Sequence, residues 1–198
     1  MRSVTTERQT KETSINLFLN LDGGEVRIAS GIGFFDHMLT ALATHAGWGL
    51  VLNCDGDVWV DSHHSIEDIG IVLGKALAEV IDKTGIKRYG SAIIPMDEAL
   101  CRAVVDVSGR PFLVYRGGEQ VQAPMIGDYD TEMTEEFLRA FAMNAGITLH
   151  VEVLYGKNAH HIVEGIFKAV AHALEDALSP RDGGVLSCLL YTSDAADE

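Results

Sequence analysis

Two halves of this chain repeat the same order of motifs, and this internal duplication constrains the fold more than any other feature of the sequence. Residues 63–67 read His-His-Ser-Ile-Glu and residues 160–164 read His-His-Ile-Val-Glu, and each segment opens a stretch with apolar residues at helical spacing. Upstream, residues 37–47 and 136–146 share helical spacing and a terminal Ala-Gly. Each half also has an alternating, strand-like stretch between a Glu and a Gly. Four matches in the same order indicate a tandem duplication.

Each half is therefore expected to contain strands, a helix, further strands and a second helix. A sheet with two helices on one face is the natural packing for such a unit, which predicts an α+β fold built from a duplicated sheet-plus-two-helices unit. The C-terminal segment has no periodicity and no relation to what precedes it, so we predict that it is a non-native tail. The expected organisation is one compact two-repeat domain, with a first repeat at 1–90, a second repeat at 91–187 and the tail at 188–198.

Local patterns give more detailed expectations. Alternating residues predict strands at 14–21 and 58–61, and the stretch 115–130 is expected to be the main loop insertion of the second repeat. Four aromatic residues are expected in the core: Phe34, Phe35, Trp48 and Trp59.

Charge and hydropathy exclude several classes of partner. The formal net charge is −14, and such an acidic chain repels nucleic acid and anionic membrane surfaces. No apolar run approaches the roughly 18 residues needed to span a bilayer, and the polar N-terminus lacks the apolar core of a secretory signal. Three cysteines without paired spacing do not suggest a disulfide framework. We therefore expect a cytoplasmic protein with neither nucleic-acid nor membrane partners.

The paired His-His-x-x-Glu motifs predict a metal site. Residues four apart share one face of a helix, so His63 can converge with Glu67, and His160 can converge with Glu164. Adjacent residues point about 100° apart, so the second histidine of each motif faces another ion, which predicts two metals. Imidazole and carboxylate ligands suit manganese, iron(II) or zinc. With one candidate from the upstream helix of each repeat, the predicted ligands are His37, His63, His64, Glu67, Glu136, His160, His161 and Glu164.

Two other functions fit parts of this pattern. A single His-His-x-x-Glu resembles reordered zinc-peptidase motifs, which would indicate a metallohydrolase, although such peptidases carry no duplicated partner. The metals could also hold subunits together in a storage or assembly protein. A kinase is disfavoured because the chain has no Walker-type glycine-rich loop.

Several long motifs, in order, identify a family resemblance. They are Lys11-Glu12-Thr13, Phe35-Asp36-His37-Met38-Leu39, His63-His64-Ser65-Ile66-Glu67-Asp68, Asp97-Glu98-Ala99-Leu100, Ser108-Gly109-Arg110-Pro111 and Gly156-Lys157-Asn158-Ala159-His160-His161-Ile162-Val163-Glu164. With these residues the chain closely resembles the imidazoleglycerol-phosphate dehydratase family from about residue 8 to residue 187. The resemblance implies a duplicated unit similar to a ribosomal-protein domain, assembled from trimers into a hollow 24-mer with its sites between subunits.

The resemblance also implies the chemistry. The expected reaction is a hydro-lyase step of L-histidine biosynthesis that converts imidazole glycerol phosphate to imidazole acetol phosphate and water. Two Mn²⁺ ions per site would hold the ring as an imidazolate, which can push out the hydroxyl group. Glu12 is the candidate proton-transfer group, and its repeat partner Glu98 would contact the site's ligands without contacting the substrate. The candidate catalytic residues are Glu12, Glu67 and Glu164, and the candidate substrate-binding residues are Glu12, His37, His63, Arg88, Arg110 and Ser187.

Two features depart from the family pattern. Glu136 stands where many relatives have His, so oxygen replaces nitrogen as the ligand atom. Ser187 is present, but the lysine that follows it in the family's Ser/Thr-Lys-Gly ending is absent. We therefore expect this chain to assemble and bind metal but to turn over poorly, which a comparison with a version carrying the family's ending would test.

Overall fold

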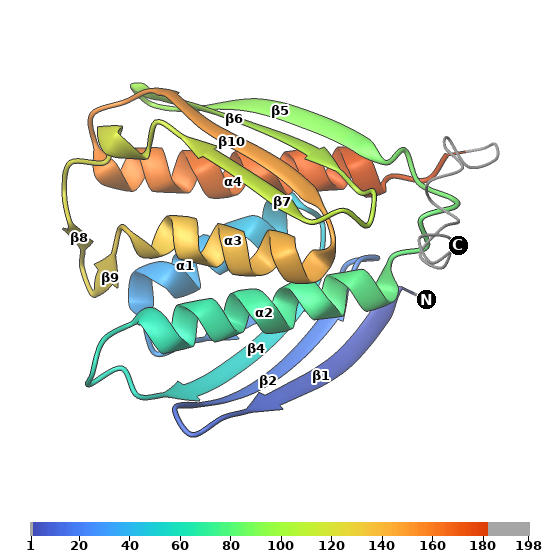
Figure 1. Ribbon diagram of the computed structural model, residues 1–198, viewed down its shortest axis with the longest axis horizontal. Coiled ribbons are helices and arrows are strands. Elements are labelled where there is room, and N and C mark those ends of the chain that lie inside the picture. Colours follow the sequence, from blue (N-terminus) through green and yellow to red (C-terminus); the bar gives the residue numbers. More distant parts are fainter. Residues whose placement is uncertain (1, 182–198) are drawn as a thin grey trace, which may run out of the picture.

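A computed structural model describes residues 2–181 and shows the two repeats as two similar halves (Figure 1). Ser187 and the tail at 188–198 lie outside the described residues. The first half has a four-stranded sheet in the order β1-β2-β4-β3 and two helices. Its elements are β1 (Ser3–Gln9), β2 (Thr13–Asn20), β3 (Val26–Ala29), α1 (Gly33–His45), β4 (Gly49–Gly56) and α2 (His63–Val80).

The second half repeats this order with one insertion. Its sheet has the order β5-β6-β10-β7, and in both sheets the last pair is parallel whereas the other pairs are antiparallel. The elements are β5 (Tyr89–Met96), β6 (Ala99–Asp106), β7 (Phe112–Arg116), η1 (Gly118–Gln120), β8 (Met125–Ile126), β9 (Tyr129–Asp130), α3 (Met133–Ala145), β10 (Thr148–Tyr155) and α4 (Ala159–Leu178). The predicted tandem α+β architecture is confirmed.

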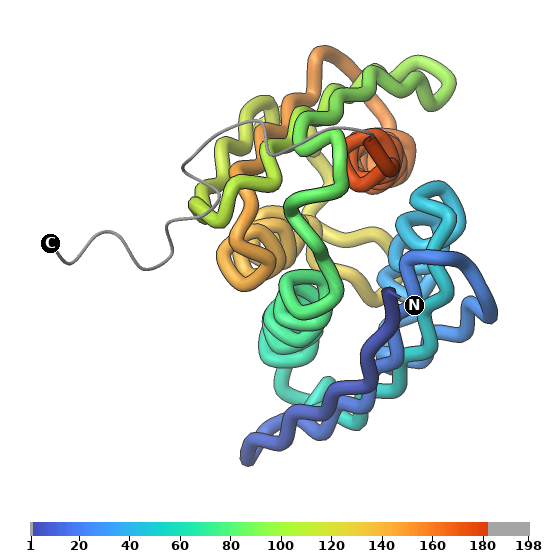
Figure 2. The backbone as a smooth tube through the Cα atoms, turned by 90° about the vertical axis from the view of Figure 1, so that its right-hand side faces the viewer, coloured from blue at the N-terminus to red at the C-terminus, as the bar shows by residue number. Residues whose placement is uncertain are grey.

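The helices lie between the two sheets. In Figure 1 the β5-β6-β10-β7 sheet forms one outer layer, the β1-β2-β4-β3 sheet forms the other, and α1 to α4 fill the space between them. The view turned by 90° again separates the blue-to-cyan strands of the first repeat from the green-to-orange strands of the second (Figure 2). The helices pair across the repeats, α2 with α3 and α1 with α4. Side chains from the two halves therefore meet between the sheets.

Alternation along the strands explains which faces are buried. In β2, Ile15, Leu17 and Leu19 are buried, and the inward positions of β6 include Cys101 and Val105. Aromatic side chains fill the space between helices: Phe137 of α3 packs 5.3 Å from Phe35 of α1 and 5.3 Å from Phe167 of α4, measured between ring centroids. The core is thus shared by both repeats.

Two glycines let α2 and α3 pack closely. A Cβ atom at Gly70 would lie 2.9 Å from the Ala140 Cβ, and one at Gly74 would lie 2.6 Å from the backbone oxygen of Phe141. Because Gly70 faces residues near 140 and Gly74 faces residues near 145, the two helices run in the same direction. This parallel arrangement brings the N-terminal ends of α2 and α3 to one end of the molecule.

Some local predictions were wrong. The strand expected at 58–61 is a turn, and Trp59 in it is 81% exposed rather than part of the core. The apolar alternation at 58–61 was too short to form a strand, and the segment instead connects β4 to α2. Trp48 and Phe35 are buried as expected, and Phe34 is partly buried. The predicted insertion at 115–130 begins within β7 and contains η1 and the β8–β9 hairpin. None of the described helices combines the length and apolar character needed to cross a membrane.

Candidate active site

Three of the predicted metal ligands meet where α1 and α4 pack together. His37 comes from α1 of the first repeat, whereas His160 and Glu164 lie one turn apart on α4 of the second. One ligand atom from each residue lies within 4.8 Å of the others. The Oε2 atom of Glu164 is 3.1 Å from the Nε2 atom of His160 and 3.4 Å from that of His37. The helical spacing accounts for the pair on α4, but the contribution of His37 requires the packing of the two repeats.

Glu164 is buried and has a cationic partner. Its side chain is 8% exposed, and its Oε1 atom accepts a hydrogen bond from Nζ of Lys168 at 2.7 Å, one helical turn further on. Burial alone would raise the pKa of the Glu164 carboxyl, but the hydrogen bond and charge of Lys168, with a smaller contribution from His37, hold it below its usual value. Sequence reasoning did not identify Lys168, although its i+4 spacing from Glu164 was the available signal. Its side chain is 20% exposed.

The equivalent pair in the first repeat is more open. His63 Nε2 lies 3.6 Å from Glu67 Oε2, and both side chains are nearly half exposed. Because α3 packs beside α2 as α1 packs beside α4, Glu136 on α3 occupies the place relative to this pair that His37 occupies relative to His160 and Glu164. In residues 2–181 no ion pair or hydrogen bond joins Glu136 to either member of the pair.

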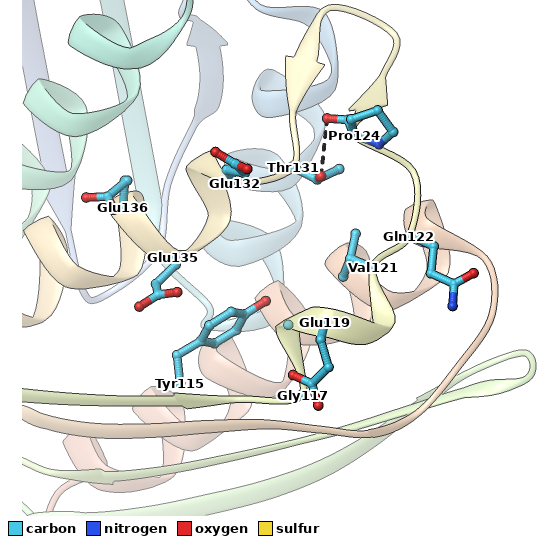
Figure 3. Close-up of a pocket in the computed structure, with 11 residues that line it drawn as sticks. Tyr115, Gly117, Glu119, Val121, Gln122, Pro124, Thr131, Glu132, Glu135 and Glu136 are labelled. Atoms are coloured by element: carbon cyan, nitrogen blue, oxygen red, sulfur yellow. Dashed lines mark hydrogen bonds between the residues drawn. The ribbon is translucent and has the colours of Figure 1, made fainter.

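Arg139 holds the Glu136 carboxylate instead. Its Nη1 atom donates to both carboxylate oxygens at 2.7 and 2.8 Å, and its Nη2 atom donates to Glu135. Glu136 lies in the wall of a cavity of about 570 Å³ (Figure 3). Tyr115 and three further acidic residues, Glu119, Glu132 and Glu135, also line this cavity. The excess of carboxylates gives it a negative potential.

The second histidine of each motif points away from its neighbour, as expected for adjacent helical residues. The His161 Nδ1 atom is 2.7 Å from Glu98 Oε2, and the His64 Nδ1 atom is 3.0 Å from Asp57 Oδ2. These hydrogen bonds raise the pKa of both imidazoles above the usual value, and the bond to His161 lowers the pKa of Glu98 to about 2. Sequence reasoning missed Asp57, which has no counterpart at the matching position of the second repeat.

Glu12 lies near His64, the second histidine of the first-repeat motif. It lines a cavity of about 260 Å³ together with Asp55 and Trp59, and its backbone oxygen accepts a hydrogen bond from the Asp57 N–H at 3.1 Å. Its side chain is exposed. In the part of the chain that the structure describes, its carboxylate takes part in no hydrogen bond or ion pair. A carboxylate in this state can accept a proton from a ligand in the cavity.

The two candidate phosphate-binding arginines share one carboxylate. Arg88 is 4% exposed and donates to Asp106 through Nε at 2.7 Å and Nη2 at 3.2 Å. Arg110 is 61% exposed, and its Nη2 atom lies 3.5 Å from Asp106 Oδ2. Hydrogen bonding to Asp106 raises the pKa of Arg88. Arg88 also has a positive φ of 77°, which shows that the surrounding structure fixes its backbone. Sequence reasoning did not identify Asp106.

Comparison with known proteins places this chain in a family. The family model for imidazoleglycerol-phosphate dehydratase matches residues 30–174. The chain is 56% identical over 181 residues to the imidazoleglycerol-phosphate dehydratase of an Exiguobacterium species, covering 90% of this chain and 92% of the relative. It is 54% identical over 190 residues to that of Alkaliphilus metalliredigens, covering 94% and 96%.

Solved structures agree with the sequence comparison. The crystal structure of imidazoleglycerol-phosphate dehydratase from Staphylococcus aureus superposes with a TM-score of 0.81 at 41% identity, over 90% of this chain and 99% of that one. The Pyrococcus furiosus structure, a complex with (S)-C348, has a TM-score of 0.79 at 34% identity, over 92% and 98%. With its duplicated fold and its clustered His and Glu residues, this chain belongs to the imidazoleglycerol-phosphate dehydratase family.

Proposed function

We propose that this chain removes water from imidazole glycerol phosphate to give imidazole acetol phosphate, a step of cytoplasmic L-histidine biosynthesis, using two bound Mn²⁺ ions. The observation that carries the proposal is the cluster of His37, His160 and Glu164 in a chain of this family. Two imidazoles and a buried carboxylate offer nitrogen and oxygen donors without sulfur, a set that suits manganese, iron(II) or zinc, and among these the family resemblance implies manganese. His37, His160 and Glu164 therefore fit the metal ion that we propose they hold.

The eight candidate ligands do not converge in one chain. His37, His160 and Glu164 form one group, and His63 and Glu67 form another. His64 and His161 face away from both groups, and Glu136 is paired with Arg139. A second copy of the chain can complete a metal site whose ligands face outward in this way. We therefore propose that the complete sites form between subunits of a large homo-oligomer built from trimers, a 24-mer as the family resemblance implies.

Binding and proton transfer are assigned to different side chains. When bound, the two cations would supply Lewis-acid stabilisation of a deprotonated imidazole ring. Glu12, which lines its own small cavity, takes the proton from the carbon beside the hydroxyl-bearing carbon. The hydroxyl group leaves from the carbon attached to the ring, and the resulting enol becomes the ketone.

Arg88 and Arg110 orient the substrate through its phosphate group. A guanidinium fork matches the spacing of phosphate oxygens, and these two side chains already converge on one anionic partner, Asp106. Asp106 keeps Arg88 in place, and Arg110 is exposed enough to reach a ligand. The phosphate would thus be held at the end of β6 in a site that a second subunit completes.

The test is metal analysis combined with a dehydratase assay. Purified full-length chain is stripped with a chelator, reloaded with Mn²⁺ and supplied with imidazole glycerol phosphate, beside a version in which the residues after Ser187 follow the family's Lys-Gly ending. We expect two ions per chain and a ketone product that retains its phosphate. His160→Ala should abolish turnover, whereas His150→Ala, at an exposed histidine of β10, should not. Release of inorganic phosphate or an amine, or less than one ion per chain, would refute the proposal.

A further inference from the structure

We infer that Glu98 and Asp57 are positioning residues, which hold the imidazoles of His161 and His64 with their Nε2 atoms available to a metal ion. The inference rests on the proposed function and adds two side chains to it. It also explains why Glu12, the repeat counterpart of Glu98, is available for proton transfer. The argument depends on which atom of each carboxylate makes which contact.

Glu98 is fixed by the backbone before it reaches the histidine. Its Oε1 atom accepts hydrogen bonds from the backbone N–H of Asn158 at 2.7 Å and of Lys157 at 3.2 Å, just before α4 begins. Its Oε2 atom is left to contact the His161 Nδ1 atom at 2.7 Å. The carboxylate therefore joins the turn between β5 and β6 to the start of α4, and the ring of His161 is tethered at a defined point.

The contact with Glu98 determines which ring nitrogen of His161 is available to a metal ion. A carboxylate can only accept a hydrogen bond, so Nδ1 must carry the hydrogen, and Nε2 can then offer its lone pair. Metal-bound histidines commonly use a carboxylate on the other ring nitrogen in this way. His161 Nε2 lies 3.6 Å from Oδ2 of Asp97, whose side chain is 74% exposed, so Nε2 faces an open side.

The first repeat achieves the same result with a different residue. By position in the repeat, Glu12 should contact His64 as Glu98 contacts His161, because each Glu precedes the inner strand of its sheet, β2 or β6. Instead, Asp57 reaches the His64 Nδ1 atom, through Oδ1 at 3.2 Å and Oδ2 at 3.0 Å. The Asp57 side chain is 13% exposed. Its backbone N–H meanwhile bonds the Glu12 backbone oxygen. The duplicated glutamate thus keeps its supporting role in one repeat and is released from it in the other.

Glu98→Gln tests the inference with little risk to the fold. The glutamine oxygen can keep the two backbone N–H bonds, which turns the side-chain NH₂ toward His161 Nδ1. That donor requires Nδ1 to act as an acceptor and moves the ring hydrogen to Nε2. We expect Mn²⁺ affinity, measured by equilibrium dialysis, to fall about 10–100-fold, the usual effect of losing such a support, while the metal-free protein stays folded, with a circular dichroism spectrum like that of the wild type.

Glu12→Gln is the matched control, because it makes the same chemical change at the equivalent position of the other repeat. It should leave Mn²⁺ affinity unchanged and lower kcat. If Glu98→Gln binds Mn²⁺ as tightly as the wild type, or if Glu12→Gln weakens binding equally, the inference is wrong. A wild-type chain that binds no Mn²⁺ would instead refute the proposed function.

Asp57→Ala provides a second test should Glu98→Gln unfold. It removes the His64 partner but retains the backbone bond to Glu12, so the path of the chain is preserved. A loss of Mn²⁺ affinity similar to that expected for Glu98→Gln supports the inference. Unchanged affinity in Asp57→Ala overturns it for the first repeat.

Discussion

Replacing Asp106 by Asn should destabilise the protein more than removing any of its exposed ion pairs. Asp106 is the carboxylate that both candidate phosphate-binding arginines contact, and Arg88 is almost completely buried against it. Asp106→Asn preserves the size of the side chain but removes its charge. The Arg88 guanidinium, which cannot release its proton, is then left buried without a counterion.

The structure sets the size of the effect. Removing one partner of a buried ion pair costs about 3–5 kcal/mol. Asp106 is 17% exposed, and Asn keeps one oxygen that can accept from Arg88, so we expect the lower end, about 3 kcal/mol. For a chain of this size each kcal/mol lowers the melting temperature by about 2–4 °C, so the expected decrease is about 6–12 °C.

The matched control is Asp176→Asn. It breaks the ion pair with Lys87, whose side chains are 51% and 44% exposed, and should cost at most about 1 kcal/mol. Both variants are compared with the wild type by thermal unfolding of the metal-free protein, followed by circular dichroism at one protein concentration. Equal melting temperatures for Asp106→Asn and Asp176→Asn would show that the buried pair contributes no more than an exposed one, and the reasoning would be refuted.

Three further predictions concern packing, thiols and pH. Gly74→Ala should cost about 1–3 kcal/mol in urea unfolding, because the added Cβ would lie 2.6 Å from a backbone oxygen of α3; unchanged stability would disprove the close contact. Cys54 and Cys101 should resist iodoacetamide at pH 8 until the protein is unfolded, because burial raises the pKa of the two thiols to about 11 and about 12; rapid native labelling, located by mass spectrometry, would contradict this. The Glu98–His161 pair should stabilise the metal-free protein most between pH 4.5 and 6.5, the usual pKa values of its members. The contribution of this pair should fall as Glu98 is protonated near pH 2, and it should also fall when the pH rises above the raised pKa of His161. The difference in melting temperature between the wild type and Glu98→Gln should therefore shrink both below and above this pH range.

The repeat pattern was sufficient to predict the architecture. Alternation places the buried residues of β2 and β6, and helical spacing places those of α2 and α4, so sheet and helices each follow from local periodicity. The turn at 58–61 could not be predicted in this way, because a short apolar run looks the same in an edge strand and in an exposed loop. The exposure of Trp59 depends on where β4 ends, which is set by tertiary packing.

The candidate site was predictable in its residue types but not in its pairings. Helical spacing brings His160 to Glu164, whereas the approach of His37 depends on α1 packing against α4, a contact between repeats. Asp57 and Asp106 were missed for the same reason. Each is a single acidic residue at the end of its strand or just beyond it, and its importance comes from the side chain it reaches in the folded chain.

The two groups of candidate metal ligands are chemically different although they belong to equivalent positions of the duplicated unit. In the second repeat Glu164 is buried and neutralised by Lys168, whereas the position equivalent to Lys168 in the first repeat is Ile71, and Glu67 is half exposed. Glu136 on α3, the remaining carboxylate among the candidate ligands, has its charge balanced by Arg139. Both of these cationic side chains come from the second repeat, Lys168 from α4 and Arg139 from α3. A cation bound near Glu67 would be reached by water, and one near Glu164 would be held among buried groups. Duplication therefore accounts for the presence of two ligand groups, and later divergence accounts for the different environment of each.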